Sequence, residues 1–258
     1  MTESNSELPD QNKKSKGKES KGYPREFFDI QIKLARKLSE ISGRPINDVL
    51  LNNTNLYKRL IGGGKPDSSN PFWQEFISGI EEQDLTNYTY QFYLRFKDRR
   101  IQTDKERLTF GFFRYDYDPD SKIVHIHFDP KQTPGSPLGD TEKRRQELRQ
   151  MFEYIKKNHP DMEKVKGGSW LYNVKKYRDI FPPEYTSNLG EYDSKYQGFS
   201  IWGQFLDRNT EIRPEKVKEF IESLDGAKNE EEILQAFPLR PLSASTSITN
   251  FYNFLGIN

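Results

Sequence analysis

The feature that most constrains the fold is a two-residue alternation of side chains that begins at Tyr88. Over residues 88–97, large apolar residues occupy every second position, which is typical of a half-buried β-strand with one wet face. Two further stretches of this kind, 108–117 and 122–128, flank the sequence Asp-Pro-Asp-Ser at 118–121, whose residues favour a tight turn. We therefore predict an antiparallel meander built from these stretches.

Helical periodicity predicts elements on both sides of the meander. The apolar residues of 27–41 share one helical stripe, which Gly43 ends. The strongest helical pattern covers 139–159, with Asp140 or Thr141 as its N-terminal cap. The remaining predicted elements are helices that begin at Pro45 and Pro71, strands at 164–171 and 196–206, and helices at 174–181, 214–224 and 229–237.

Together these elements predict an α+β fold. We expect an antiparallel sheet of about five strands, with helices packed on one face and a helical N-terminal layer. Residues 1–22 are polar and are predicted to be disordered, since they hold too few apolar side chains to offset their ordering entropy. Residues 23–258 are predicted to form a single globular domain, with the helical layer in 23–83 and the sheet–helix body in 84–258.

The composition limits the classes of site that the chain can hold. Hydrophobic residues make up 33% of the chain and aromatic residues 14%, which predicts a core that depends on large aromatic side chains. There is no cysteine. Disulfides, thiolate catalysis and cysteine-ligated metals are therefore excluded, and a reducing, cytoplasmic location is favoured.

Charge and hydropathy also narrow the expected partners. The formal net charge is +1, so no general electrostatic attraction to nucleic acid is expected. No apolar run approaches the ~18 residues of a membrane span. The polar N-terminus has no apolar core of a secretory signal. The expected partner is therefore a small-molecule ligand or another protein, without nucleic acid or membrane.

His125 and His127 are the most conspicuous candidate catalytic residues. Two positions apart on a predicted strand, they project from the same face. Imidazoles titrate near neutral pH and serve as general acids or bases. If the strand continues, Asp129 joins them and the set can ligate a divalent metal. The simplest alternative is a pair of structural or exposed histidines, and a resident metal is not the favoured expectation.

The segment Gly167-Gly168-Ser169-Trp170 is the second candidate site. Paired glycines permit close approach of a ligand to the backbone, and their amides can bind an anion or a carbonyl oxygen. Ser169 can donate a hydrogen bond to a substrate, so we predict it as a third catalytic residue. The alternative is a bulged strand start with Trp170 in the core. The predicted substrate-binding set is Gly167, Gly168, Trp170, Tyr172, Asn173 and Lys176.

Two other patterns imitate known sites and fail on inspection. The glycines at 62–64 precede Lys65, but Pro66 stands where a phosphate-binding loop requires Ser or Thr. The alternating aspartates at 116–120 resemble the start of a calcium loop, but His127 occupies the position of its bidentate glutamate. We interpret the first as a glycine loop that ends a helix and the second as a charged hairpin tip.

The order of motifs over 125–190 resembles that of bacterial acyltransferase-like proteins related to the GNAT superfamily. The resemblance rests on a strand that ends in His-x-His, a long helix, Gly-Gly-Ser-Trp-Leu, an aromatic-rich helix, Phe-Pro-Pro at 181–183 and Asn188. It implies an acyltransferase-like activity with acyl-CoA as the cofactor. It also implies that His125, His127, Ser169 and Trp170 line one pocket.

A non-catalytic protein-interaction module, such as a toxin-neutralising (immunity) or adaptor domain, is the alternative. It is favoured by the abundant surface charge, by Tyr93, Tyr115 and Tyr117, which are expected to be exposed, and by the missing catalytic signature. The two hypotheses differ in geometry. An enzyme requires the histidines and Ser169 to converge in one concave pocket, whereas an interaction module leaves them scattered.

Overall fold

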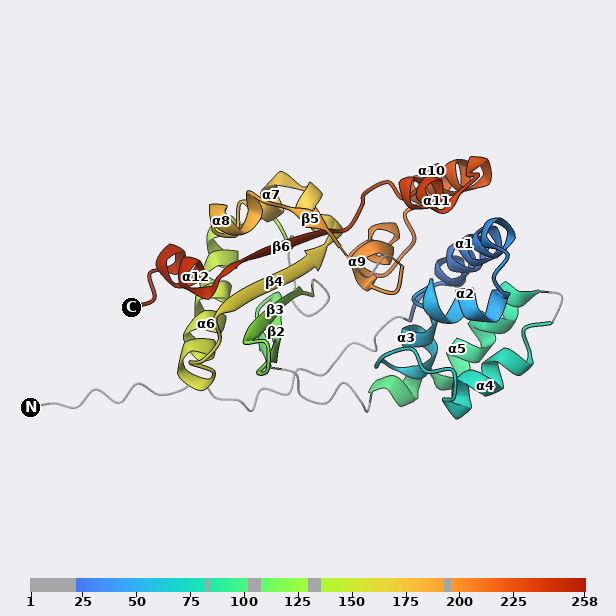
Figure 1. Ribbon diagram of the computed structural model, residues 1–258, viewed down its shortest axis with the longest axis horizontal. Coiled ribbons are helices and arrows are strands. Elements are labelled where there is room, and N and C mark those ends of the chain that lie inside the picture. The colour runs from blue at the N-terminus through green and yellow to red at the C-terminus, as the bar shows by residue number, and fades with distance from the viewer. Residues whose placement is uncertain (1–21, 82–83, 102–107, 130–135, 193–195) are drawn as a thin grey trace, which may run out of the picture.

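The computed structural model describes residues 22–81, 84–101, 108–129, 136–192 and 196–258. Its elements gather at two ends of the molecule into a helical body and a sheet body (Figure 1). The predicted disordered tail, residues 1–22, lies outside the described residues except for Gly22. Over the ranges that are described, no helix combines the length and the apolar character that crossing a bilayer requires.

The helical body combines two separate parts of the chain. Helices α1 to α5 come first, and the chain returns much later to pack α10 and α11 against α1 (Figure 1). The bounds are α1 (Arg25–Ser42), α2 (Ile46–Asn52), α3 (Leu56–Ile61), α4 (Pro71–Ser78), α5 (Leu85–Ile101), α9 (Phe199–Trp202), the 3-10 helix η2 (Gly203–Phe205), α10 (Pro214–Gly226) and α11 (Glu230–Gln235).

The predicted ends of the first helices agree with the structure. Gly43 closes α1 with φ 69°, and its N–H donates to the carbonyl of Ser39. The helix predicted from Pro45 is divided into α2 and α3 by a break after Asn52. The helix predicted from Pro71 is confirmed, and the Asn70 side chain caps it.

The predicted strand at 88–97 is wrong, because these residues belong to helix α5. Its buried side chains lie at helical spacing, one, three, three, one and three positions apart. They are Leu85, Thr86, Thr89, Phe92, Tyr93 and Phe96. The alternation was misleading because Tyr93, counted on the wet face of a strand, is only 4% exposed. Thr89 satisfies its hydroxyl by donating to the Leu85 carbonyl.

The predicted strand at 196–206 is also wrong, because this stretch forms α9 and η2. A short apolar run does not distinguish a buried strand from a buried helical turn. Here Trp202 donates its indole N–H to the Tyr196 carbonyl at 2.6 Å, and Gln204 donates to the carbonyls of Ile201 and Leu239. These buried hydrogen bonds hold the turns in the helical core.

The sheet body contains a six-stranded mixed sheet of order β1-β2-β3-β4-β6-β5. β3 and β4 are parallel, and the other neighbouring pairs are antiparallel. The strands are β1 (Thr109–Phe110), β2 (Phe113–Asp118), β3 (Ile123–Phe128), β4 (Lys164–Ser169), β5 (Gly190–Glu191) and β6 (Leu242–Ser247).

The α+β class is confirmed, but the predicted antiparallel sheet of about five strands is corrected to a mixed sheet of six. The predicted hairpin forms as β2 and β3. The long helix α6 (Thr141–Asn158) then supplies the crossover connection that the parallel pairing of β3 and β4 requires. Its cap is Asp140, whose carboxylate accepts from the Lys143 N–H at 2.9 Å.

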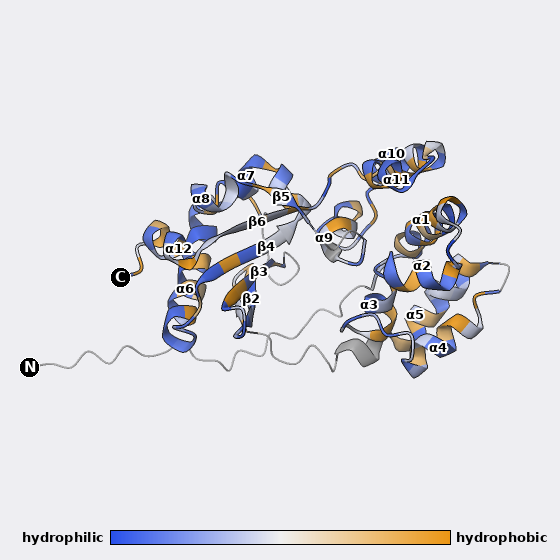
Figure 2. Cartoon of the chain, in the orientation of Figure 1, coloured by the Kyte–Doolittle hydropathy of each residue, from blue (hydrophilic) through white to orange (hydrophobic). Residues whose placement is uncertain are grey.

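Helices cover the face of the sheet that carries the core. α6 is mostly hydrophilic in Figure 2, and its apolar residues at three- and four-residue spacing are buried. Phe152 of α6 stacks on Phe251 of the last helix, α12 (Ile248–Leu255), with ring centroids 4.4 Å apart. The apolar end of the chain therefore packs on α6 and belongs to the core of the sheet body. The shorter helices are η1 (Trp170–Asn173), α7 (Lys175–Arg178) and α8 (Pro183–Thr186).

A buried ion pair secures the corner between β1 and β2. Glu147 of α6 accepts from the Phe112 N–H at 3.1 Å and pairs with Arg144 at 2.8 Å. The Arg144 guanidinium lies 4.0 Å from the centroid of the Phe112 ring. Gly111 turns the chain here with φ 61°, and a Cβ at this position would lie 2.0 Å from the carboxyl carbon of Glu147.

The buried hydrophobic side chains form two clusters, one in each body. The helical cluster draws on residues 27–96 and again on 196–237. It therefore extends well past the boundary at residue 83 that was predicted for the helical layer. The second cluster lies between the sheet and helices α6, α7, α8 and α12.

Candidate functional site

The two histidines share one face of β3, as predicted. Val124 and Ile126, which alternate with them, are buried in the sheet-body core, so His125 and His127 project from the opposite face. The strand register places Arg114 beside His127. This face of the sheet is consequently polar and partly exposed.

An acidic side chain holds His127. Its Nε2 lies 2.6 Å from the carboxylate of Asp116, which also lies 3.7 Å from the guanidinium of Arg114. Asp116 is 61% exposed, so this histidine–carboxylate–guanidinium set is open to water. Surface pairs of this kind contribute little to stability.

His125 lies in a different electrostatic environment. The register places it between Asp116 of β2 and Lys166 of β4. Burial, followed by the electrostatic effects of His127 and Lys166, lowers the pKa of His125, while Asp116 and Asp118 oppose the shift. The lowered pKa favours the neutral imidazole.

This shift predicts a pH dependence of stability. Below the ordinary histidine pKa of ~6.5, the unfolded chain takes up a proton that the folded chain binds more weakly, so the unfolding free energy should fall as the pH falls through this window. NMR titration of the ring protons measures the pKa directly. Lys166→Gln should raise it, and Lys164→Gln, on the same face, is the control. A His125 that titrates at or above the ordinary value contradicts this prediction.

Ser169 lies on the other face of the sheet from the histidines. Its strand β4 is paired without interruption to β6, so Ser169 shares a face with Val165, whereas Lys166 shares one with His125. The Ser169 hydroxyl accepts from the Leu171 N–H at 3.0 Å and caps η1. The structure therefore does not bring His125, His127 and Ser169 into one pocket, contrary to the expected arrangement.

The two glycines are points of close approach, but this chain's own tyrosines occupy both. A Cβ on Gly167 would lie 2.4 Å from the hydroxyl oxygens of Tyr172 and Tyr185. A Cβ on Gly168, on the histidine face, would lie 1.9 Å from Cε2 of Tyr192. The glycines thus permit dense aromatic packing on both sides of β4.

The other predicted binding residues are dispersed around η1. Tyr172 is buried, its hydroxyl lies 2.8 Å from that of Tyr185, and burial raises its pKa well above the ordinary value. Trp170 is half-buried. Asn173 donates to the carbonyls of Trp170 and Arg240, and Lys176 is exposed. These side chains do not converge on a common space.

The structure gives no support for a metal site at the histidines or at the acidic hairpin tip. Among the residues that the structure describes, no three His, Asp or Glu side chains come together as a metal site. The acidic hairpin tip forms a turn instead, in which Asp118 accepts from the N–H groups of Asp120 and Ser121.

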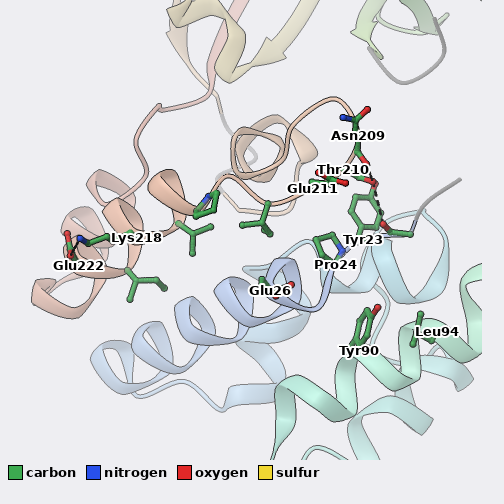
Figure 3. Close-up of a pocket in the computed structure, with 15 residues that line it drawn as sticks. Tyr23, Pro24, Glu26, Tyr90, Leu94, Asn209, Thr210, Glu211, Lys218 and Glu222 are labelled. Carbon is green, nitrogen blue, oxygen red and sulfur yellow. Dashed lines mark hydrogen bonds and ion pairs between the residues drawn. The ribbon is translucent and has the colours of Figure 1, made fainter. Parts of the chain in front are cut away.

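A separate hollow lies in the helical body, where the sequence predicted no site. A cavity of about 960 Å³ opens between the N-terminus of α1, helix α5, helix α10 and the preceding loop 207–213 (Figure 3). We call it the α1–α5–α10 groove. Its apolar lining includes Pro24 and Pro214. The other apolar side chains are half-buried at the edge of the helical core: Tyr23, Tyr90, Leu94, Ile212, Val217 and Ile221.

Two apolar rows face this groove. Tyr90 and Leu94 are four positions apart on α5, and Val217 and Ile221 are four positions apart on α10. Residues at this spacing lie one above the other on a helix, so each pair forms a short ridge along its helix. Because Tyr90 and Leu94 were assigned to a strand, the sequence pattern did not reveal their row.

The loop wall of the groove is braced by a turn. The Asp207 carboxylate accepts from the N–H groups of Asn209 and Glu211, at 2.7 and 2.9 Å. Thr210 at the tip has φ 64°, a left-handed conformation that is rare for a β-branched residue. Its hydroxyl donates to the Asn209 carbonyl at 2.5 Å and also lies 3.4 Å from the Gly22 carbonyl, at the start of the described chain. A rare conformation at a cavity rim is a feature typical of binding sites.

Comparisons of the chain with protein-family models, with curated proteins and with solved structures found no match. The resemblance of 125–190 to GNAT-related proteins therefore stays a prediction.

Proposed function

We propose that the protein is a non-catalytic protein-interaction module that binds a segment of a partner protein in the α1–α5–α10 groove. The observation that carries this proposal is the groove itself, with its two apolar ridges and its opening to solvent. Recognition of a helical segment by an apolar groove is a recurring mode of protein binding. The adaptor and toxin-neutralising functions considered from the sequence both belong to this class.

The alternative of acyl transfer lacks supporting geometry. It needs a histidine base and Ser169 close to one substrate atom. Ser169 lies on the opposite face of the sheet from both histidines. Its hydroxyl caps η1 by accepting from the Leu171 N–H. The groove lining, in turn, contains no histidine among the described residues and is dominated by apolar side chains.

Point variants in the two ridges test the proposal. Peptides of about 16 residues, roughly 24 Å as a helix, would be selected for binding to the wild-type protein. We expect Leu94→Arg and Ile221→Arg to weaken their binding by more than about tenfold, because each places a charge in an apolar contact. Fluorescence anisotropy measures the affinities, and circular dichroism verifies that the variants are folded.

Phe72→Arg is the matched control. Phe72 is a 42% exposed aromatic residue in the same helical body, and it does not line the groove. Its replacement should leave peptide affinity unchanged. If no peptide is selected, or if selected peptides bind the ridge variants as tightly as wild type, the groove is not a protein-binding site and the proposed function is wrong.

A further inference from the structure

The walls and the rim of the groove point to a particular kind of partner. We propose that the bound segment is an amphipathic α-helix whose apolar stripe is flanked by Lys and Arg side chains. This inference rests on the proposed function and specifies its partner.

The walls favour a helical occupant over an extended one. α5 and α10 satisfy their backbone groups internally, so they offer no row of free N–H and C=O groups to an added strand. An extended segment lying on the two ridges would leave its own backbone groups unpaired where the partner excludes water. A helix satisfies these groups itself and presents apolar residues at i, i+4 and i+7 to the ridges.

The rim of the groove is acidic. Its described lining contains three acidic side chains, Glu26 of α1, Glu211 of the loop and Glu222 of α10 (Figure 3). The same lining contains one basic side chain, Lys218. An adjoining hollow on α10 adds Glu215 and Glu219, of which Glu219 is paired with Lys216 at 2.8 Å.

This local charge differs from that of the whole chain, whose formal net charge is +1. Lys218 lies 3.7 Å from Glu222, and each is mostly exposed, so the lysine offsets only part of the negative charge. Flanking acids attract a basic partner and repel an acidic one, which adds selectivity to the apolar contact.

The chain's own lysine-rich N-terminal segment is a competing occupant. It holds Lys13, Lys14, Lys16, Lys18 and Lys21 and leads directly to Gly22 in the groove wall. However, Leu8 and Met1 are its only large apolar residues, which is too few for a stripe that contacts both ridges. Deletion of residues 1–21 distinguishes this segment from a partner protein as the occupant of the groove. If the segment occupies the groove, its deletion would strengthen peptide binding.

Two model peptides test the inference. Both are 16-residue helices with the same leucine stripe, and they carry either lysine or glutamate on the flanks. We expect the lysine peptide to bind at least about tenfold more tightly at low salt, with the difference shrinking as salt rises. A proline in the middle of the lysine peptide should abolish binding, since it breaks the helix.

Charge variants of the protein supply the matched comparison. Glu26→Gln combined with Glu222→Gln should remove most of the preference for lysine, whereas Glu40→Gln combined with Glu184→Gln, exposed acids outside the groove, should preserve it. Equal binding of both peptides that is lost in Leu94→Arg would overturn the basic-partner inference and leave the proposed function standing. Tight binding of the proline peptide would overturn the helical partner. If neither model peptide binds while peptides without basic flanks are selected from the library, the inference is likewise wrong.

Discussion

Replacing Gly111 with alanine is expected to destabilise the sheet body by about 4–7 kcal/mol. The left-handed φ of 61° alone costs a side chain roughly 1–2 kcal/mol. The new methyl group would also lie 2.0 Å from the carboxyl carbon of Glu147, forcing it away from Phe112 and Arg144. Breaking one side of a buried ion pair typically costs about 3–5 kcal/mol. Urea unfolding followed by circular dichroism measures the loss.

A double-mutant cycle separates the two causes. In a Glu147→Ala background the carboxylate is absent, so Gly111→Ala should add only the backbone cost of roughly 1–2 kcal/mol. An additional loss as large as that in the wild-type background would show that the corner does not depend on the contact between Gly111 and Glu147.

Gly167→Ala is expected to have a similar effect in the centre of the sheet. Its Cβ would meet the hydroxyl oxygens of Tyr172 and Tyr185 at 2.4 Å, and both rings are almost fully buried. Overpacking a core costs about 1–3 kcal/mol. Separating the two hydroxyls adds about 1–3 kcal/mol, because each is left buried without a partner. We therefore expect a loss of about 3–5 kcal/mol by urea unfolding.

Removing the two oxygens should partly rescue this variant. Tyr172→Phe combined with Tyr185→Phe creates space for the methyl group, so Gly167→Ala should cost less in that background than in wild type. The experiment also discriminates between roles for the glycine. If Gly167 were kept small to admit a ligand, its alanine variant would remain as stable as wild type.

Local sequence signals predicted the elements that depend on short-range chemistry. The turn residues at 118–121 located the β2–β3 hairpin, and the cap at Asp140 located the start of α6. The glycine at 43 located the end of α1. In each case the residues that decide the structure lie within a few positions of one another, and the local preference agrees with the global fold.

The errors arose where tertiary contacts decide the structure. The residues of α5 fit both a two-residue and a helical period, and only their contacts with α1 and α3 select the helix. β6 has the sequence Leu-Ser-Ala-Ser-Thr-Ser, which has little strand character and forms a strand because it lies between β4 and β5.

The candidate site also combines features that followed from local sequence patterns with features that depended on tertiary contacts. Gly167 and Gly168 were predicted to let a ligand approach the backbone, whereas the structure places tyrosines of the same chain against both. The shared face of His125 and His127 followed from strand periodicity, whereas the position of Ser169 on the far side required the sheet register. The groove brings together residues near 23, 90 and 217, which no local pattern connects.

The return of the chain to the helical body has a consequence for biosynthesis. A ribosome that has completed residues 1–195 has produced α1 to α5, but residues 196–237, which complete their core, follow only later. The sheet is likewise incomplete until residues 242–247 have been synthesised, because they form β6, which lies between β4 and β5. Both bodies therefore reach their native packing only after most of the polypeptide has been translated, and an early stop codon would leave each with an uncovered apolar surface that invites aggregation.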